Sequence, residues 1–259
     1  MNNRLVNIIL SAVFFTAVFP NAAPAQINIE QKRSQLENKG WGADLELYLT
    51  VNQGNTELVQ FDNISSLAHR SDPHMGFLLL NFSTGESAGE RILDKGMGHL
   101  RYNKMLNPTM FWEVFTQLEY DEFTLLELRW LLGSGPRIVL ADQKKVNAAL
   151  GVALMREYEE LNLHRDDGRT VKECAYLISS YLDVSLSINN IITFSNTVYF
   201  QPTLKDVDNF KVLNDASLTF QIINILSFKV TLNLKYDSQP PPEVKNLDLQ
   251  LKNGVVVRL

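Results

Sequence analysis

The chain has 259 residues, of which 45% are hydrophobic and 20% are charged, and its formal net charge is −5. An acidic chain repels the phosphate backbone, so this composition argues against nucleic acid as a partner. The single cysteine, Cys174, excludes an intramolecular disulfide and a thiolate metal cluster. The length fits one all-β domain.

Residues 1–25 have the pattern of a secretory signal peptide. Arg4 supplies a positive charge, a mainly apolar run follows it, and Ala-Pro-Ala at 23–25 is a small-x-small cleavage site. The apolar run is shorter than the roughly 20 residues of a spanning helix, which favours a signal peptide over a membrane anchor. We expect a mature chain from Gln26 with 23 basic and 29 acidic side chains, a net charge of −6. Residues 26–40 form a polar periplasmic linker in this prediction.

Apolar and polar residues alternate along most of the chain after the linker. The pattern is clearest in residues 226–237, and it continues to Leu259 with Asn253 and Val256 as the two exceptions. A period of two is typical of strands with one face in an apolar medium and the other in a polar one. The segments with this pattern are 41–52, 58–69, 75–83, 96–105, 112–120, 126–140, 146–158, 174–188, 191–201, 211–221, 226–237 and 247–259.

These segments predict an all-β fold, an antiparallel up-and-down transmembrane β-barrel of about twelve strands over residues 41–259, with both termini periplasmic. A sheet in a membrane has to close on itself, because lipid cannot satisfy its backbone groups. The predicted connections alternate in length, as periplasmic turns and outer loops do. Short ones lie at 70–74, 106–109, 141–145, 189–190 and 223–225, and longer ones at 84–95, 159–172, 202–209 and 238–243.

Three groups of residues, taken in order, resemble a known family. Gly54-Asn55-Thr56 follows the first strand, Tyr120-Asp121-Glu122-Phe123, Arg129 and Gly133-Ser134-Gly135 lie in the middle, and Tyr236-Asp237-Ser238 with Asp248 lies in the last hairpin. In order and spacing they resemble the salt-induced outer membrane protein (YdiY-like) family, β-barrels with a domain of unknown function. The resemblance implies an outer-membrane barrel of Gram-negative bacteria without an established activity.

The chain departs from that family's pattern at two places. Pro136 follows Gly135 where the family tends to have another glycine, and the chain ends on Leu259. Barrel proteins commonly end on an aromatic residue that helps the assembly machinery to recognise the last strand. We therefore expect this recognition to be weaker, since the alternation of the last strand is retained.

Eight charged residues are predicted to face the lumen. Their mixture of signs can form a structural network of ion pairs or line a pore, and side chains can fill the lumen of a barrel of this size, which favours packing over conduction. Asp121 and Arg129 flank a tight hairpin, so we expect them to pair across it. The eight residues are Glu113, Glu119, Arg129, Asp183, Asp215, Lys229, Lys235 and Lys252.

The sequence contains no motif for catalysis, cofactor binding or metal binding. A serine hydrolase needs a serine beside a histidine, but Gly133-Ser134-Gly135 is not the Gly-x-Ser-x-Gly elbow. We expect these glycines to relieve crowding or to let the strand curve. No nucleophile motif accompanies any of the four histidines, His69, His74, His99 and His164.

The sequence therefore predicts a non-enzymatic outer-membrane protein, an envelope component that responds to salt or osmotic conditions. A narrow porin-like channel for ions or small solutes is the alternative. An outer-membrane lipid hydrolase and a soluble periplasmic lipocalin-like binder also stay open. The expected partners are outer-membrane lipids, lipopolysaccharide and the outer-membrane assembly machinery.

Overall fold

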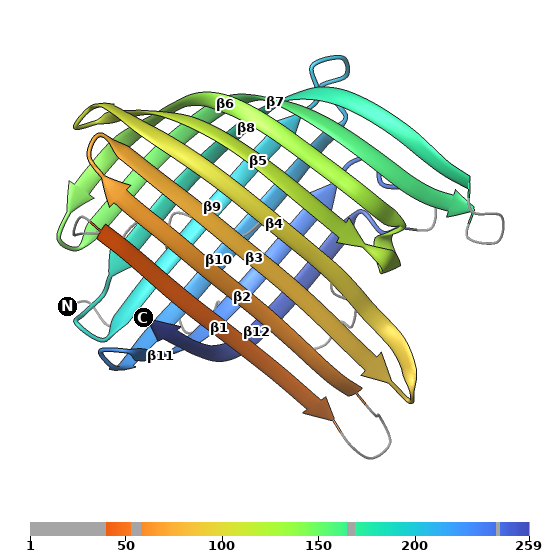
Figure 1. The fold of residues 1–259 in the computed structure, drawn as a ribbon, viewed down its shortest axis with the longest axis horizontal. Helices are drawn as coiled ribbons and strands as arrows, with labels where there is room; N and C mark the ends of the chain where they lie inside the picture. Colours follow the sequence, from red (N-terminus) through yellow and green to blue (C-terminus); the bar gives the residue numbers. More distant parts are fainter. Residues whose placement is uncertain (1–39, 53–57, 165–168, 242–243, 259) are drawn as a thin grey trace, which may run out of the picture.

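The computed structural model describes residues 40–52, 58–164, 169–241 and 244–258. The predicted signal peptide and the motif residues Gly54 and Asn55 lie outside this part of the chain. No helix within it has the length and hydropathy to cross a membrane. The strands, shown in Figure 1, are β1 (Gly40–Asn52), β2 (Leu58–Ser71), β3 (His74–Ser87), β4 (Glu90–Asn107), β5 (Met110–Asp121), β6 (Leu126–Gln143), β7 (Val146–His164), β8 (Arg169–Ser187), β9 (Ile192–Pro202), β10 (Phe210–Ile223), β11 (Leu226–Asp237) and β12 (Leu247–Arg258).

Each strand pairs antiparallel with its neighbours in sequence, and β12 pairs with β1, which closes the sheet. The predicted fold, an up-and-down antiparallel barrel of twelve strands, is confirmed. Gly40 and Arg258 lie at the same end of the barrel, which we call the terminus end (Figure 1). The connections that follow β1, β3, β5, β7, β9 and β11 lie at the opposite end, which we call the loop end.

Two of the predicted loops are mostly strand. The loop predicted over 84–95 is wrong, because β3 continues to Ser87 and β4 begins at Glu90. The loop predicted over 159–172 is wrong in the same way, since β7 runs to His164 and β8 begins at Arg169. Both hairpins extend the barrel at its loop end with mainly polar residues, among which Leu93 and Leu161 are buried. Backbone pairing continues there without the apolar alternation that the prediction used.

One predicted turn is also longer than expected. The sequence suggested a two-residue turn at Asn189-Asn190, but β8 and β9 are separated by residues 188–191. The side chain of Asn189 closes this connection by accepting hydrogen bonds of 2.8 Å from the backbone N–H groups of Ile191 and Ile192. Local side-chain capping of this kind is a common use of asparagine in turns.

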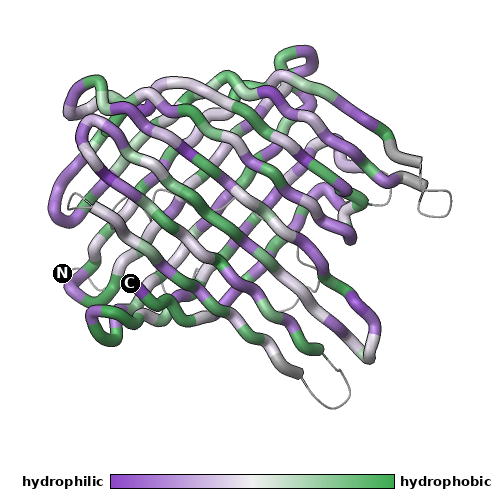
Figure 2. The backbone as a smooth tube through the Cα atoms, viewed as in Figure 1, coloured by the Kyte–Doolittle hydropathy of each residue, from purple (hydrophilic) through white to green (hydrophobic). Residues whose placement is uncertain are grey.

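The barrel is apolar outside and charged inside. Leu49, Leu118 and Leu154 point outward and are 67%, 52% and 53% exposed. Lys95 and Arg101 point inward and are buried. Figure 2 shows the resulting alternation of hydrophobic and hydrophilic residues along the strands. A water-soluble barrel has the opposite arrangement, whereas an apolar outer band with a polar interior is typical of barrels in the outer membrane.

Aromatic rings pack over glycines of the neighbouring strand. Phe115 on β5 is the register partner of Gly133, and Tyr181 on β8 is the partner of Gly151. A Cβ atom would lie 2.3 Å from the Phe115 ring at Gly133 and 2.1 Å from the Tyr181 ring at Gly151. At Gly135 a Cβ atom would lie 2.0 Å from the backbone oxygen of Val152. These glycines therefore leave room for large inward-facing rings and for close approach of two strands.

We expect Gly151→Ala to lower the free energy of unfolding by about 1–3 kcal/mol, because the added methyl group forces the Tyr181 ring out of its place. Gly76 on β3 is a matched control, since nothing lies within 4 Å of its Cβ position. Gly76→Ala should change the stability by less than about 0.5 kcal/mol. Urea unfolding of both refolded variants in lipid vesicles measures the difference. Equal stability of the two variants would contradict the packing role of the ring.

Candidate functional site

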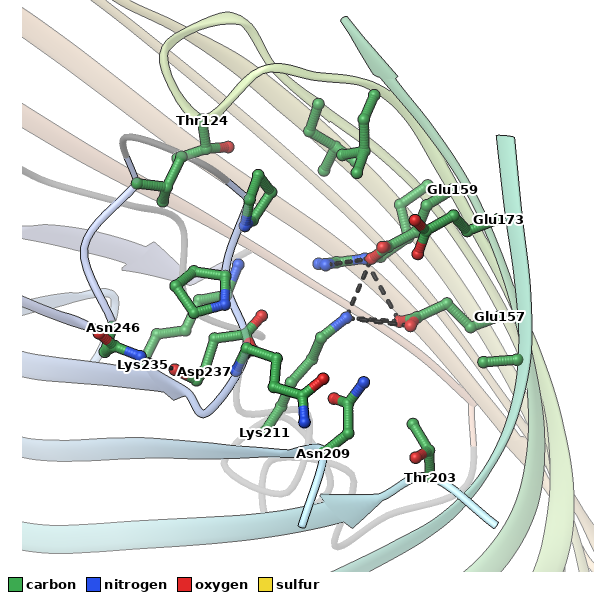
Figure 3. A pocket seen from close by; sticks show the side chains of 18 of the residues that line it. Thr124, Glu157, Glu159, Glu173, Thr203, Asn209, Lys211, Lys235, Asp237 and Asn246 are labelled. Atoms are coloured by element: carbon green, nitrogen blue, oxygen red, sulfur yellow. Dashed lines mark hydrogen bonds and ion pairs between the residues drawn. The ribbon is translucent and has the colours of Figure 1, made fainter. Parts of the chain in front are cut away.

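An ion-pair cluster crosses the lumen near the loop end, and we call it the mouth cluster. Its members are Glu119, Arg129, Glu157, Glu159 and Lys211. Arg129 Nη1 lies 2.7 Å from Glu119 Oε1, its Nε lies 3.4 Å from Glu157 Oε2, and its guanidinium also binds Glu159. Lys211 Nζ donates to Glu157 at 3.0 and 3.1 Å and to Glu159 at 3.0 Å. Figure 3 shows Lys211 pointing from β10 toward these two carboxylates on β7, so the cluster bridges strands that are not neighbours.

A cavity of about 320 Å³ lies against the mouth cluster at the loop end (Figure 3). Arg129, Glu157 and Lys211 line it from the cluster, and Lys235 and Asp248 line it from β11 and β12. Residues 239–241 and 244–246, which connect those two strands, also line it, as do residues 173–175 of β8. A polar solute that entered this cavity would therefore meet charges of both signs.

A second cluster surrounds Glu113 on β5. Arg101 Nη1 lies 3.4 Å from Glu113 Oε2, and the Tyr181 hydroxyl donates to the same oxygen at 2.8 Å. The Arg101 guanidinium also lies 5.2 Å from the ring centroid of Phe115 and 5.7 Å from that of Tyr181. Arg137 approaches Glu113 Oε1 at 3.9 Å. Side chains from β4, β5, β6 and β8 therefore meet and fill this section of the lumen.

His99 connects the two clusters. Its Nδ1 lies 3.0 Å from Gln117 Oε1, and Gln117 Nε2 donates to Glu119 Oε2 at 2.5 Å. The His99 ring stacks on Phe115 with 5.8 Å between centroids. A hydrogen-bonded chain therefore runs along the wall from His99 to the mouth cluster.

A third set of ion pairs crosses the junction of β1 with β12. Lys229 on β11 donates to Glu46 on β1 at 3.2 and 3.1 Å. Lys252 on β12 donates to Asp62 on β2 at 2.9 Å. At the terminus end Arg258 Nε lies 3.5 Å from Asp44 Oδ1. Ion pairs inside the lumen thus join the last two strands, β11 and β12, to the first two, β1 and β2.

Of the eight residues predicted to face the lumen, all except Lys235 are buried. Glu113, Glu119, Arg129, Lys229 and Lys252 take part in the ion pairs described above. Asp183 accepts a hydrogen bond of 2.7 Å from Thr197 Oγ1, and Asp215 accepts one of 2.7 Å from Asn233 Nδ2. Lys235 lines the cavity.

Several interior residues were not among the predicted set. Glu157 lies near the end of the predicted strand 146–158, and Glu159 lies at the start of the predicted loop 159–172. On β4 the outward positions include Gly96 and Gly98, so hydropathy does not mark which face of that strand is inside. An alternation along β4 that takes Met97 as an inward residue is the signal that could have found Lys95 and Arg101. The missed residues are Glu46, Asp62, Lys95, Arg101, Arg137, Glu157, Glu159 and Lys211.

The predicted pairing of Asp121 with Arg129 is wrong. Asp121 Oδ1 instead accepts hydrogen bonds of 3.0 and 3.2 Å from the backbone N–H groups of Phe123 and Thr124, which caps the 3-10 helix η1 (Glu122–Thr124). Arg129 turns to the mouth cluster. Nearby backbone donors reach the Asp121 carboxylate through the tight turn, whereas Arg129 has three carboxylates on the wall beside it.

Three other residues that carry the family resemblance are Tyr120, Tyr236 and Asp248, and the structure places them in packing contacts or at the cavity. The Tyr120 hydroxyl donates to Asp94 at 3.1 Å, and its ring covers Gly96. The Tyr236 ring packs 5.8 Å from that of Phe210. Asp248 lines the cavity.

Ser134, His69 and His74, which were considered for a hydrolase site, make hydrogen bonds and ring contacts with neighbouring side chains and backbone. Ser134 Oγ accepts from Trp112 Nε1 at 2.9 Å and donates to the backbone oxygen of Glu113 at 3.1 Å. The His69 ring packs 4.4 Å from Trp41, and His74 Nδ1 lies 2.6 Å from the Tyr102 hydroxyl. Across the described ranges, no group of three or more His, Cys, Asp or Glu side chains is placed to hold a metal ion.

Comparison with known proteins places this geometry among outer-membrane barrels. The family model described as "Protein of unknown function, DUF481" matches residues 45–258. No curated protein has a matching sequence. The translocator domain of the autotransporter NalP from Neisseria meningitidis has a TM-score of 0.53 at 7% identity, over 98% of this chain and 96% of that chain. The NanC porin has a TM-score of 0.51 at 8% identity, over 83% of this chain and 98% of that chain. At these identities the likeness shows the fold alone.

We expect Arg129→Met to lower the free energy of unfolding by about 3–5 kcal/mol, because it leaves buried carboxylates facing one another without their shared cation. Arg91→Met is the control, since the Arg91 side chain is 58% exposed and its pair with Asp94 lies in water. It should cost less than about 1 kcal/mol. Urea unfolding in vesicles compares the two variants. A similar small loss in both would show that the mouth cluster does not hold the lumen together.

Proposed function

This chain belongs to the DUF481 family of proteins of unknown function, and we propose that it is a non-enzymatic outer-membrane barrel whose lumen is closed at rest by packed, ion-paired side chains. In this proposal residues 1–25 direct export, and the outer-membrane assembly machinery inserts the barrel. Outer-membrane lipids and lipopolysaccharide then surround its apolar outer face. The protein acts as a component of the envelope.

The burial of the interior charges is the observation that carries this proposal. In a water-filled channel the side chains of the wall contact water. Here Lys95, His99, Arg101 and Asn103 on β4 are 2%, 1%, 1% and 0% exposed. His99 contacts Gln117 and Arg101 pairs with Glu113, both on β5, so these polar groups meet protein atoms rather than an aqueous path.

The placement of polar and apolar residues favours this role over the other two classes. A soluble lipocalin-like binder needs a polar outer face and an apolar interior, and this barrel has the reverse. A lipid hydrolase needs a nucleophile beside a base, but the Ser134 hydroxyl is hydrogen-bonded to Trp112 and to the backbone of Glu113.

A narrow channel is the second candidate, and the cavity at the loop end favours it. That cavity, about 320 Å³, already admits a small solute as far as the mouth cluster. The NanC neighbour is named a porin. Conduction would require Arg129 and Lys211 to leave their carboxylates, so the channel would be a gated one.

Single-channel recording of the refolded protein in a planar bilayer separates the two candidates. We expect no discrete current steps from protein that a gel-mobility shift on boiling shows to be folded. Discrete steps would contradict the closed lumen and favour the channel. In that case Lys235→Glu, at the cavity wall, should shift the ion selectivity toward cations.

The salt response is a separate part of the proposal. It is supported by the motifs that resemble the salt-induced family, of which Tyr120, Asp121 and Arg129 are the central group. We expect the amount of this protein in the outer-membrane fraction to rise when cells grow at higher salt, as immunoblotting would measure. An unchanged amount would remove the salt response and leave the closed barrel unaffected.

A further inference from the structure

Two asparagines face outward from neighbouring strands of the barrel wall. Asn196 on β9 stands opposite Ala216 on β10, and Asn214 on β10 stands opposite Val198 on β9, so the two amides are diagonal neighbours. The residues that precede and follow each asparagine are buried, and successive side chains of a strand point to opposite faces. Both amides therefore lie on the outer face, and we call Asn196 and Asn214 the asparagine pair.

Aromatic rings lie on the outer wall on both sides of the asparagine pair. Toward the loop end, the Phe210 ring lies 5.6 Å from that of Phe200 and 5.8 Å from that of Tyr236. Toward the terminus end, the Phe220 ring lies 6.3 Å from that of Phe228. Phe210 and Phe220 are ten positions apart on β10, which gives a height of about 25 Å for a strand tilted by about 40°. This is the height of the apolar band between two aromatic girdles, so in an outer-membrane barrel the pair faces hydrocarbon.

The two amides satisfy only some of their hydrogen-bonding groups. Asn214 Nδ2 donates to Asn196 Oδ1 at 2.6 Å and to the backbone oxygen of Thr197 at 3.2 Å, which uses both of its N–H groups. Among the described residues, neither Asn196 Nδ2 nor Asn214 Oδ1 has a hydrogen-bond partner. An unmet donor and an unmet acceptor thus stand side by side. Hydrocarbon offers a partner to neither, which makes this arrangement costly for a single barrel.

Some other polar side chains of the outer face are matched within the barrel. Trp130 Nε1 donates to the Thr116 hydroxyl at 3.0 Å, and that hydroxyl donates to a backbone oxygen of β6. Trp112 Nε1 donates to the Ser134 hydroxyl at 2.9 Å, and Ser134 donates to the backbone of β5. These groups need no partner from outside the barrel. The asparagine pair differs from them, because its unmet groups can be satisfied only by another molecule.

Small side chains surround the asparagine pair. Its four register partners on the flanking strands are Val184 on β8, Val198 on β9, Ala216 on β10 and Leu234 on β11. Three of these four are valine or alanine, so the wall lacks bulky side chains beside the two amides. Proteins associate within membranes where small residues allow close approach and polar side chains form hydrogen bonds across the contact. The patch has both properties.

We propose that the asparagine pair is the centre of a homodimer interface, on which a second copy of this barrel packs with its own pair across a twofold axis. Asn196 Nδ2 then donates to the partner subunit's Asn214 Oδ1, and the same bond forms in the opposite direction. One contact therefore satisfies both unmet groups of both copies. A self-complementary patch of this kind gives an isologous interface that closes at two copies. This inference rests on the proposed placement of the barrel in the outer membrane, since water would otherwise satisfy the amides.

Energy transfer between labelled copies tests the dimer. The mature chain, labelled at its amino terminus with either a donor or an acceptor dye, is refolded into lipid vesicles at a series of lipid-to-protein ratios. We expect energy transfer above the level of randomly distributed barrels, and we expect it to fall as lipid is added, because dilution in the bilayer dissociates a dimer. Transfer at the random level at every ratio would overturn the proposal.

Variants locate the interface. Asn196→Leu and Asn214→Leu should each weaken the association by about tenfold, because each removes two symmetry-related hydrogen bonds. Both should keep the gel-mobility shift on boiling, since leucine suits a position that faces hydrocarbon. Asn253→Leu on β12 is the control, because it removes another exposed amide, and it should associate as the parent protein does. Unchanged association in both variants of the pair, or an equal loss in the control, would overturn the proposal.

Cross-linking tests the contact with the asparagine pair intact. In a Cys174→Ser background, Ala216→Cys places one cysteine inside the patch, so two copies should oxidise to a disulfide-linked dimer. Leu80→Cys on β3 is the control, since it is 49% exposed and β3 lies opposite β9 in the closed strand order. Equal cross-linking of the two would show random collisions and overturn the interface. Release of the parent protein from membranes by alkali without detergent would instead contradict the outer-membrane role on which the inference rests.

Discussion

This structure depends on one constraint: charged side chains inside the closed barrel need partners of opposite charge. The barrel turns its apolar residues outward, so its charged residues lie in an interior that largely excludes water, where an uncompensated charge is costly. Arg129 binds three carboxylates near the loop end, and Lys211 binds two of the same three. Arg101 and Tyr181 share Glu113 in the middle, and lysines on β11 and β12 reach the carboxylates of β1 and β2. Most of these partners stand on strands that are not neighbours. The ion pairs therefore fill the cross-section of a barrel whose wall the backbone ladder builds.

Lys95 is the exception to this compensation. Its side chain is 2% exposed, and its ammonium has no hydrogen-bond partner among the described residues. Asp121 stands opposite Lys95 in register, but its Oδ1 accepts hydrogen bonds from the backbone of η1. The backbone ladder between β1 and β12 is also shorter than that between the other strands, with four register pairs.

The fold was predictable because an alternation of apolar and polar residues identifies the two faces of a strand from neighbouring residues alone. The same alternation identified Glu119 and Lys252 as inward-facing. It failed at residues 84–95 and 159–172, where the hairpins are mainly polar and their few apolar residues do not form a regular alternation. It missed Lys95 because Gly96 and Gly98 hide the outer face of β4. The short pairing between β1 and β12 had no sequence signal, since it depends on how the first and last strands meet when the barrel closes.

Amide hydrogen exchange along β1 and β12 of the refolded protein tests the central claim, a barrel that the four register pairs of these two strands close. The account predicts slow exchange at residues 44–47 and 255–258, where the strands pair with each other. Fast exchange is expected for those amides of residues 48–52 and 247–254 that point away from β2 and β11. Uniformly slow exchange along both strands would show that their pairing continues beyond the four register pairs and would contradict the short junction. Uniformly fast exchange along both would contradict the closure of the barrel itself.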